Sequence, residues 1–128
     1  MKSEKVLTPA ELTAMYDEYN AAIAAVDLAE GVREIRVKDA PKWIADAAQR
    51  RSEAISDFDA LEINAFLAST MIADRYEIIS RLRKQAPPVS WSKIGGVLGM
   101  SKQAAQQWYE HFNLRPRIEN PTRKAGPS

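Results

Sequence analysis

The fold is decided by the stretch SWSKIGGVLGMSKQAAQQWYEHF, Ser90–Phe112. Ser90 can cap a first helix that ends at Leu98, because its hydroxyl can accept a hydrogen bond from a backbone N–H of the first turn. Gly99 follows where the chain must turn, a position that favours a residue without a Cβ. Ser101 can then cap a second helix, which runs to the end of the stretch. A turn this short sets two helices at the steep angle of a helix-turn-helix.

The apolar residues of this stretch fall where the two helices would meet. Ile94, Leu98 and Met100 supply the side chains that wedge the helices together. Gly95 stands at the point of closest approach, where we expect a side chain larger than alanine to separate the helices. The apolar residues of the second helix follow the i, i+3, i+4, i+7 spacing of a buried face. They are Ala105, Trp108, Tyr109 and Phe112.

The opposite face of the second helix is polar and rich in glutamine. Glutamine can form paired hydrogen bonds with adenine, and lysine can donate to the acceptors of guanine. The sequence therefore predicts that helix 101–112 enters the major groove of double-stranded DNA. The predicted base-contacting residues are Ser101, Lys102, Gln103, Gln106 and Gln107.

The net charge of +1 hides an asymmetry along the chain. Residues 80–128 hold nine Lys or Arg against two acidic residues, a charge of +7, and residues 1–79 then carry −6. Such asymmetry indicates an anionic partner for the basic part, although a solvated basic tail has the same composition. The predicted phosphate contacts are Arg81, Arg83, Lys84, Ser90, Lys93, Arg115, Arg117, Arg123 and Lys124.

The stretch WSKIGGVLGMSKQAAQQ resembles the helix-turn-helix of small actinobacterial and phage DNA-binding proteins. These proteins often carry the pattern W-x-x-I-[AG]-x-x-L-G-[VM]-S-[KR]-Q-A-A, preceded by a helix with basic residues at its end. The resemblance covers Asp74–Phe112, about a third of the chain. It implies that the five predicted base-contacting residues face the major groove and that Trp91 anchors the motif. Two departures are Pro87-Pro88, which stiffens the entry loop, and Trp108, which is bulkier than the residue usual there.

The remainder of the chain also has helical patterns. Thr8, Pro9 and Glu11 form a capping box with proline at the first helical position, so a helix begins there. Gly31 is the expected stop, and residues 32–38 are expected to form a linker. Residues 41–85 follow as one long helix or as two. In the second case the break lies near Ser56–Asp59, with Asp59 and Glu62 as a capping pair.

These patterns predict an all-α protein with an N-terminal helical arm or bundle, a C-terminal helix-turn-helix and a basic disordered tail. The expected divisions are residues 1–62 for dimerisation or partner binding, 63–114 for DNA binding, and 115–128 for the flexible tail. The tail prediction depends on its proline content and its lack of large apolar residues.

Other chemistries find little support in the sequence. The absence of cysteine excludes disulfides and Cys-based zinc sites. His111 is the only histidine and no second ligand type clusters with it, so no metal site, cofactor or catalytic residue is expected. Lys93 with Gly95-Gly96 lacks the spacing of a phosphate loop. No stretch has the length of a membrane span, so we expect a cytoplasmic, nucleoid-associated protein without a membrane partner.

The leading hypothesis is a sequence-specific transcriptional regulator of repressor type that binds double-stranded DNA and is not an enzyme. A homodimer or another protein partner would use the N-terminal helices. Two alternatives stay open. One is a protein-interaction module, such as an antitoxin, an adaptor or a phage protein that binds a host factor. The other is an accessory subunit for DNA packaging or recombination that uses the same motif.

Overall fold

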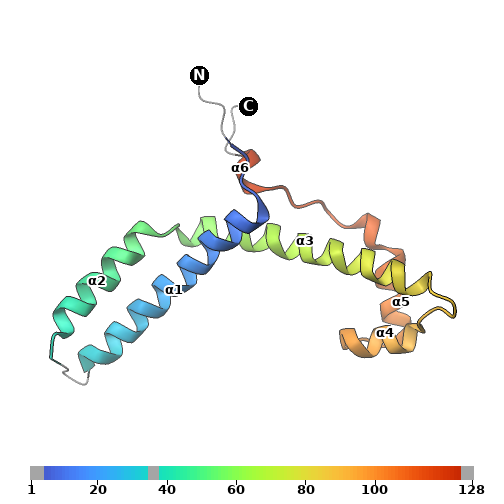
Figure 1. Ribbon diagram of the computed structural model, residues 1–128, viewed down its shortest axis with the longest axis horizontal. Helices are drawn as coiled ribbons and strands as arrows, with labels where there is room; N and C mark the ends of the chain where they lie inside the picture. The colour runs from blue at the N-terminus through green and yellow to red at the C-terminus, as the bar shows by residue number, and fades with distance from the viewer. Residues whose placement is uncertain (1–4, 35–37, 125–128) are drawn as a thin grey trace. The chain divides into compact units, whose positions relative to one another are not determined.

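A computed structural model of the chain describes residues 5–34 and 38–124, without the side chains of Glu34, Arg123 and Lys124. The described residues are helical and contain no strand (Figure 1), so the predicted all-α class is confirmed. The elements are α1 (Pro9–Glu34), α2 (Ala40–Glu53), α3 (Asp57–Arg83), α4 (Trp91–Leu98), α5 (Lys102–Glu110), the 3₁₀ turn η1 (Phe112–Leu114) and α6 (Pro121–Lys124). The predicted phosphate contacts of Arg123 and Lys124 lie outside the described side chains.

The chain divides into two compact units, and the division falls within α3. Unit 1 comprises the described parts of residues 1–67 and 119–128, and unit 2 comprises residues 68–118. The first part of α3 therefore belongs to unit 1 and the second part to unit 2. The basic C-terminal residues 119–124 belong to unit 1, whereas the sequence predicted a separate tail from residue 115 onwards.

Helix α1 begins with the capping box that the sequence predicted. The Thr8 N–H donates to Glu11 Oε1 at 3.2 Å, and the Glu11 N–H donates to Thr8 Oγ1 at 3.1 Å. The hydrogen bond from the Thr8 N–H favours the charged carboxylate, so the pKa of Glu11 lies below its ordinary value. The prediction of this helix start is confirmed.

The predicted stop of α1 at Gly31 is wrong, because the helix continues to Glu34. A Cβ on Gly31 would meet no atom within 4 Å, and Gly31 does not have the positive φ of a helix-ending glycine. Val32, the next residue, is only 8% exposed, so its burial stabilises the added turn. The linker predicted from residue 32 therefore begins later, and residues 35–37 lie outside the described part of the chain.

Helices α1 and α2 pack against each other (Figure 1), and each buries small side chains. The buried residues include Ala22 and Ala29 on α1 and Ala40 and Ala47 on α2. In each helix the two alanines stand seven residues apart, which is two helical turns, so they lie on one face. Alanine at these positions allows the two backbones to approach closely.

Residues 41–85 form two helices, separated at Ala54–Ser56. The N-cap of α3 is Ser56, whose Oγ accepts a hydrogen bond from the Asp59 N–H at 3.1 Å. The predicted pair of Asp59 and Glu62 is therefore displaced by one turn, because Asp59 is already within the helix. The serine hydroxyl takes the cap that the sequence assigned to the aspartate.

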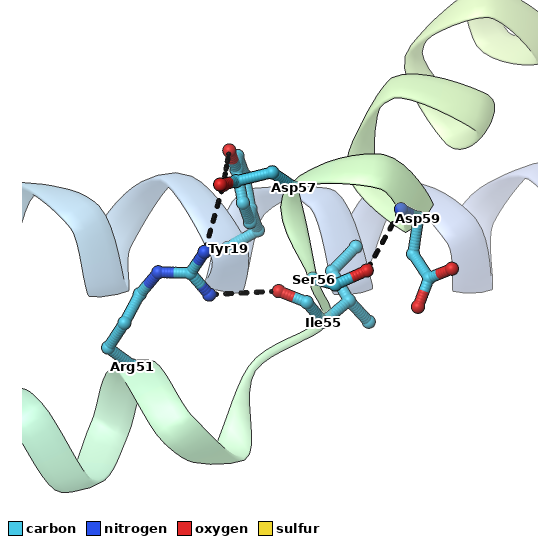
Figure 2. A network of polar contacts seen from close by, with 6 residues as sticks. All are labelled: Tyr19, Arg51, Ile55, Ser56, Asp57 and Asp59. Carbon is cyan, nitrogen blue, oxygen red and sulfur yellow. Dashed lines mark hydrogen bonds and ion pairs between the residues drawn. The ribbon is translucent and has the colours of Figure 1, made fainter.

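A polar network joins α1, α2 and the start of α3 next to this break (Figure 2). Arg51 donates to the Ile55 carbonyl oxygen at 3.0 Å and to Asp57 Oδ1 at 2.9 Å. The Tyr19 hydroxyl donates to the same carboxylate oxygen at 2.6 Å. This hydrogen bond to Asp57 raises the pKa of Tyr19, because it stabilises the protonated phenol. Side chains of α1 and α2 thus hold the first turn of α3.

The segment predicted to be a disordered tail contains a short helix. Asn120 caps α6 by accepting from the Thr122 N–H at 2.8 Å, and its Nδ2 donates to the Leu7 carbonyl oxygen at 2.9 Å. Residues 120–124 are therefore folded against the start of unit 1, contrary to the expectation. Proline at the first position of α6 and the asparagine cap explain why so polar a segment forms a helical turn.

Candidate nucleic-acid interface

The two short helices of unit 2 begin where their serine caps predict. Helix α4 begins after Ser90, whose Oγ accepts from the Lys93 N–H at 3.1 Å. It ends at Gly99, which has φ 68° and ψ 30°, in the left-handed region. The Met100 N–H donates to the Gly95 carbonyl oxygen at 2.8 Å, and the Gly99 N–H donates to that of Gly96 at 3.4 Å. This pair of hydrogen bonds is a Schellman motif, which fixes the direction in which the chain leaves α4.

Gly95 is confirmed as the point of closest approach, and the fit is tighter than the sequence suggested. A Cβ at Gly95 would lie 2.7 Å from the Met100 carbonyl oxygen and 3.0 Å from that of Ser101. Both atoms are backbone, so they cannot move aside as a side-chain tip can. The expectation that alanine would fit is therefore wrong.

Helix α5 begins after Ser101, whose Oγ accepts from the Ala104 N–H at 3.1 Å. The helix ends at Glu110, earlier than the predicted end at Phe112. Phe112 instead begins η1, so the chain tightens into a 3₁₀ turn at the end of α5. The predicted cap is confirmed and the predicted length is too great by less than a turn.

Unit 2 has a core of three buried residues, Ile79, Ile94 and Ala105, which come from α3, α4 and α5. Each helix therefore contributes one residue that is at most 4% exposed. Larger side chains pack against this core and are partly buried: Leu82, Val89, Trp91, Leu98, Met100, Trp108 and Tyr109. The predicted buried face of the second helix is confirmed at Ala105, with Trp108 and Tyr109 beside it.

Aromatic stacking links α3 to α5 through Tyr76, a contact that the sequence did not predict. The Tyr76 ring stacks on Tyr109 at 4.7 Å and on Phe112 at 4.5 Å between centroids. Ser80 Oγ lies 2.7 Å from the Tyr109 hydroxyl, and the buried Ser80 also donates to the Tyr76 carbonyl oxygen. Hydrogen bonding with Tyr109 raises the pKa of Tyr76. The four-residue spacing of Tyr76 and Ser80 on one helix was the signal available in the sequence.

The structure brings the predicted base-contacting residues to the outer side of α5. Lys102, Gln103 and Gln107 are exposed, as is Ser101, although the Ser101 hydroxyl also caps the helix. Gln106 differs from them, because it is half-buried and its Nε2 donates to Glu110 Oε1 at 3.1 Å. Ala104 is exposed beside them.

The predicted phosphate-contacting residues of unit 2 divide into exposed and engaged side chains. Arg83 is half-buried, because it donates to the Val89 carbonyl oxygen at 2.8 Å and lies 4.9 Å over the Trp91 ring. Arg115 is exposed but lies 6.0 Å over the Trp108 ring, which Arg75 also approaches at 5.7 Å. The exposed members of the set are Arg81, Lys84, Ser90, Lys93, Arg115 and Arg117.

Within residues 68–118, no Lys or Arg side chain forms an ion pair with a carboxylate. The ion pairs of the described chain join residues of unit 1, as in the bidentate contact of Arg50 with Glu18. The hydrogen bonds between these two side chains lower the pKa of Glu18 and raise the pKa of Arg50. The exposed Arg81, Lys84, Lys93 and Arg117 therefore have no carboxylate partner among the described residues.

No group of three His, Asp or Glu side chains that could hold a metal ion occurs in the described part of the chain. The described helices include none with the length and apolar character of a membrane span. Comparison with known proteins found no matching family model, no matching curated protein and no matching solved structure.

Proposed function

We propose that α4, the turn and α5 form a helix-turn-helix that binds double-stranded DNA, with α5 in the major groove. The protein would act as a sequence-specific transcriptional regulator of repressor type at the nucleoid. The proposal depends mainly on one observation. Lys102, Gln103 and Gln107 are exposed on a short helix whose first turn is capped by the Ser101 hydroxyl. These side-chain types match the hydrogen-bonding groups of base edges.

The geometry of the turn supports this proposal. Base readout requires a recognition helix that is held in one orientation. The close backbone contact at Gly95 and the Schellman hydrogen bond from Met100 fix α5 against α4. The Tyr109 contacts with Tyr76 and Ser80 fix α5 against α3.

The charges of unit 2 support it as well. Lys84, Lys93 and Arg117 are exposed and have no carboxylate partner among residues 68–118. Phosphate contacts of this kind supply most of the affinity for DNA and make it fall as salt rises.

The proposal is tested by fluorescence anisotropy of a labelled duplex at salt concentrations from about 50 to 200 mM. We expect binding that weakens as salt rises. Lys93→Gln should lower the slope of log K against log salt by roughly one. Lys42→Gln, an exposed lysine of unit 1, is the matched control and should leave the slope unchanged. Absence of salt-dependent binding to any duplex would contradict the proposal.

A protein partner for unit 1 is the second candidate function. Leu28 on α1 is 71% exposed, Trp43 on α2 is 47% exposed and Phe58 on α3 is 68% exposed. Large apolar side chains left open in this way are typical of interaction surfaces. If the partner is a second copy, sedimentation equilibrium of the full chain will show a dimer that Trp43→Gln weakens. A monomer at all concentrations would exclude self-association.

A further inference from the structure

We propose that the exposed side of α5 reads an A·T base pair, with Ala104 touching the thymine methyl group and Gln103 or Gln107 binding the adenine. This inference rests on the proposed DNA-binding function and specifies its target. It adds Ala104 as a residue that determines base specificity. The sequence does not indicate this role, because the alanine side chain has no hydrogen-bonding group.

The three residues form one patch on the helix. Ala104 and Gln107 are three positions apart and Gln103 and Gln107 are four apart, so their Cβ atoms are neighbours on the helical surface. All three side chains are exposed. Ala105, the next residue, is completely buried, so the apolar surface of α5 that packs into unit 2 is separate from Ala104. The Ala104 methyl group is therefore presented on the same side as the two amides.

The chemistry of this patch matches an A·T pair better than a G·C pair. In the major groove, adenine offers the N7 acceptor and the N6 donor that a glutamine amide can bind together. Its partner thymine offers a C5-methyl group, for which a small apolar side chain is the natural contact. Guanine instead offers two acceptors and is usually bound by arginine or lysine. Of the patch residues, none carries a cation.

Two nearby polar residues are assigned other roles by their contacts. Gln106 is half-buried, and its amide nitrogen donates one of its two hydrogens to Glu110, a contact that holds the amide against its own helix. Glu110 could accept a hydrogen bond from cytosine, but it is the last residue of α5. Recognition helices of this kind contact base edges with their N-terminal residues. Gln106 and Glu110 therefore support the helix rather than read the pair.

The test begins with selection of bound duplexes from a random library, using the full chain. An A·T pair should be fixed in the selected site, and it should become variable when Gln103 or Gln107 is replaced by alanine. The loss of affinity for the selected duplex should be roughly fivefold to a hundredfold for the glutamine that binds the adenine. Gln106→Ala is the matched control, on the same helix, and should cost less.

The methyl contact is tested by replacing each thymine of the selected site with uracil, which removes only the C5-methyl group. One replacement should weaken binding by about fourfold, the effect of one buried methyl-sized group. Ala104→Gly should bind the thymine and uracil duplexes equally. Because glycine weakens a helix, the melting temperature and the binding of an unrelated duplex are measured for the same variant.

The outcomes separate the two proposals. If no duplex binds, the proposed function fails and this inference fails with it. If the protein selects a G·C pair, or if no uracil replacement changes the affinity of the wild type, DNA binding stands and the inference is overturned. If Ala104→Gly keeps the preference for thymine, the methyl contact belongs to another residue and the role of Ala104 is refuted.

Discussion

The two units of this protein are stabilised in different ways. Unit 2 depends on a few positions with strict requirements: Gly95 without a Cβ, Ala105 fully buried, and a Tyr109 ring that both stacks and hydrogen-bonds. Unit 1 depends on buried alanines together with Leu12, Val32 and Ile63, and on polar contacts that are largely exposed. In the unit proposed to bind DNA, one added atom, a Cβ at Gly95, would thus change how the helices pack. The part proposed to bind a protein has Leu28, Trp43 and Phe58 exposed.

The strongest test of this contrast is Gly95→Ala. The added Cβ would lie 2.7 Å from a backbone oxygen, so α4 and the turn must shift. We expect the free energy of unfolding of unit 2 to fall by roughly 1 to 3 kcal/mol, the range for overpacked sites. The measurement is urea denaturation followed by tryptophan fluorescence in a Trp43→Phe background, so that only Trp91 and Trp108 report.

The matched control is Gly96→Ala, the next residue of the same helix. A Cβ at Gly96 would meet no atom within 4 Å, and alanine is the better helix former. This variant should be more stable than the wild type by about 0.5 to 1 kcal/mol. Equal destabilisation by both substitutions would show that α4 tolerates neither and that the close contact is not the cause.

A smaller effect is expected from Tyr109→Phe. The phenyl ring keeps the stacking with Tyr76, at 4.7 Å between centroids, but the hydroxyl group that lies 2.7 Å from Ser80 Oγ is lost. Ser80 is buried and keeps its second hydrogen bond, to the Tyr76 carbonyl oxygen. We expect a loss of about 0.5 to 1.5 kcal/mol in the same denaturation experiment. Loss of specific DNA affinity well beyond this destabilisation would mean that the hydroxyl also sets the angle of α5.

Much of the fold was predictable where the signal is local. The capping box of Thr8, the cap of Ser90 and the turn at Gly99 depend on residues within one helical turn, and the structure has each as the sequence predicted. Gly31 was misjudged because glycine is also tolerated inside a helix, and only the burial of Val32 decides that α1 continues. The burial of a side chain such as Val32 depends on a neighbouring element, so the sequence within one helical turn does not predict it.

The sequence predicted which residues form the candidate site, but not which hydrogen bonds their side chains make. Helical periodicity alone puts the residues of α5 on its polar face, and four of the five predicted base-contacting side chains are exposed. The hydrogen bond between Gln106 and Glu110 could not be chosen in advance, because Gln106 has other polar neighbours one turn away. The partners of Arg83 were hidden for a related reason, since the Val89 carbonyl oxygen becomes available only through the path of the loop.

The smallest effect, and the one that tests unit 1, is the pH dependence of the contact between Glu18 and Arg50. Hydrogen bonding to Arg50 lowers the pKa of Glu18 below its ordinary value of 4.5, so the folded state favours the charged carboxylate. The contribution of this contact to stability is therefore present above the unfolded pKa and is lost as pH falls through the lower pKa of the folded state.

Because both side chains are exposed and screened by solvent, Glu18→Gln should lower the urea midpoint at pH 7 by less than Tyr109→Phe does. Near pH 3 the difference between Glu18→Gln and the wild type should shrink, whereas Asp46→Asn, an exposed residue of α2, should show no such change. A difference that stays constant between the two pH values would mean that the charge of Glu18 contributes nothing. The stability of unit 1 would then depend on its buried apolar residues and on the contacts of Tyr19 and Arg51 with Asp57.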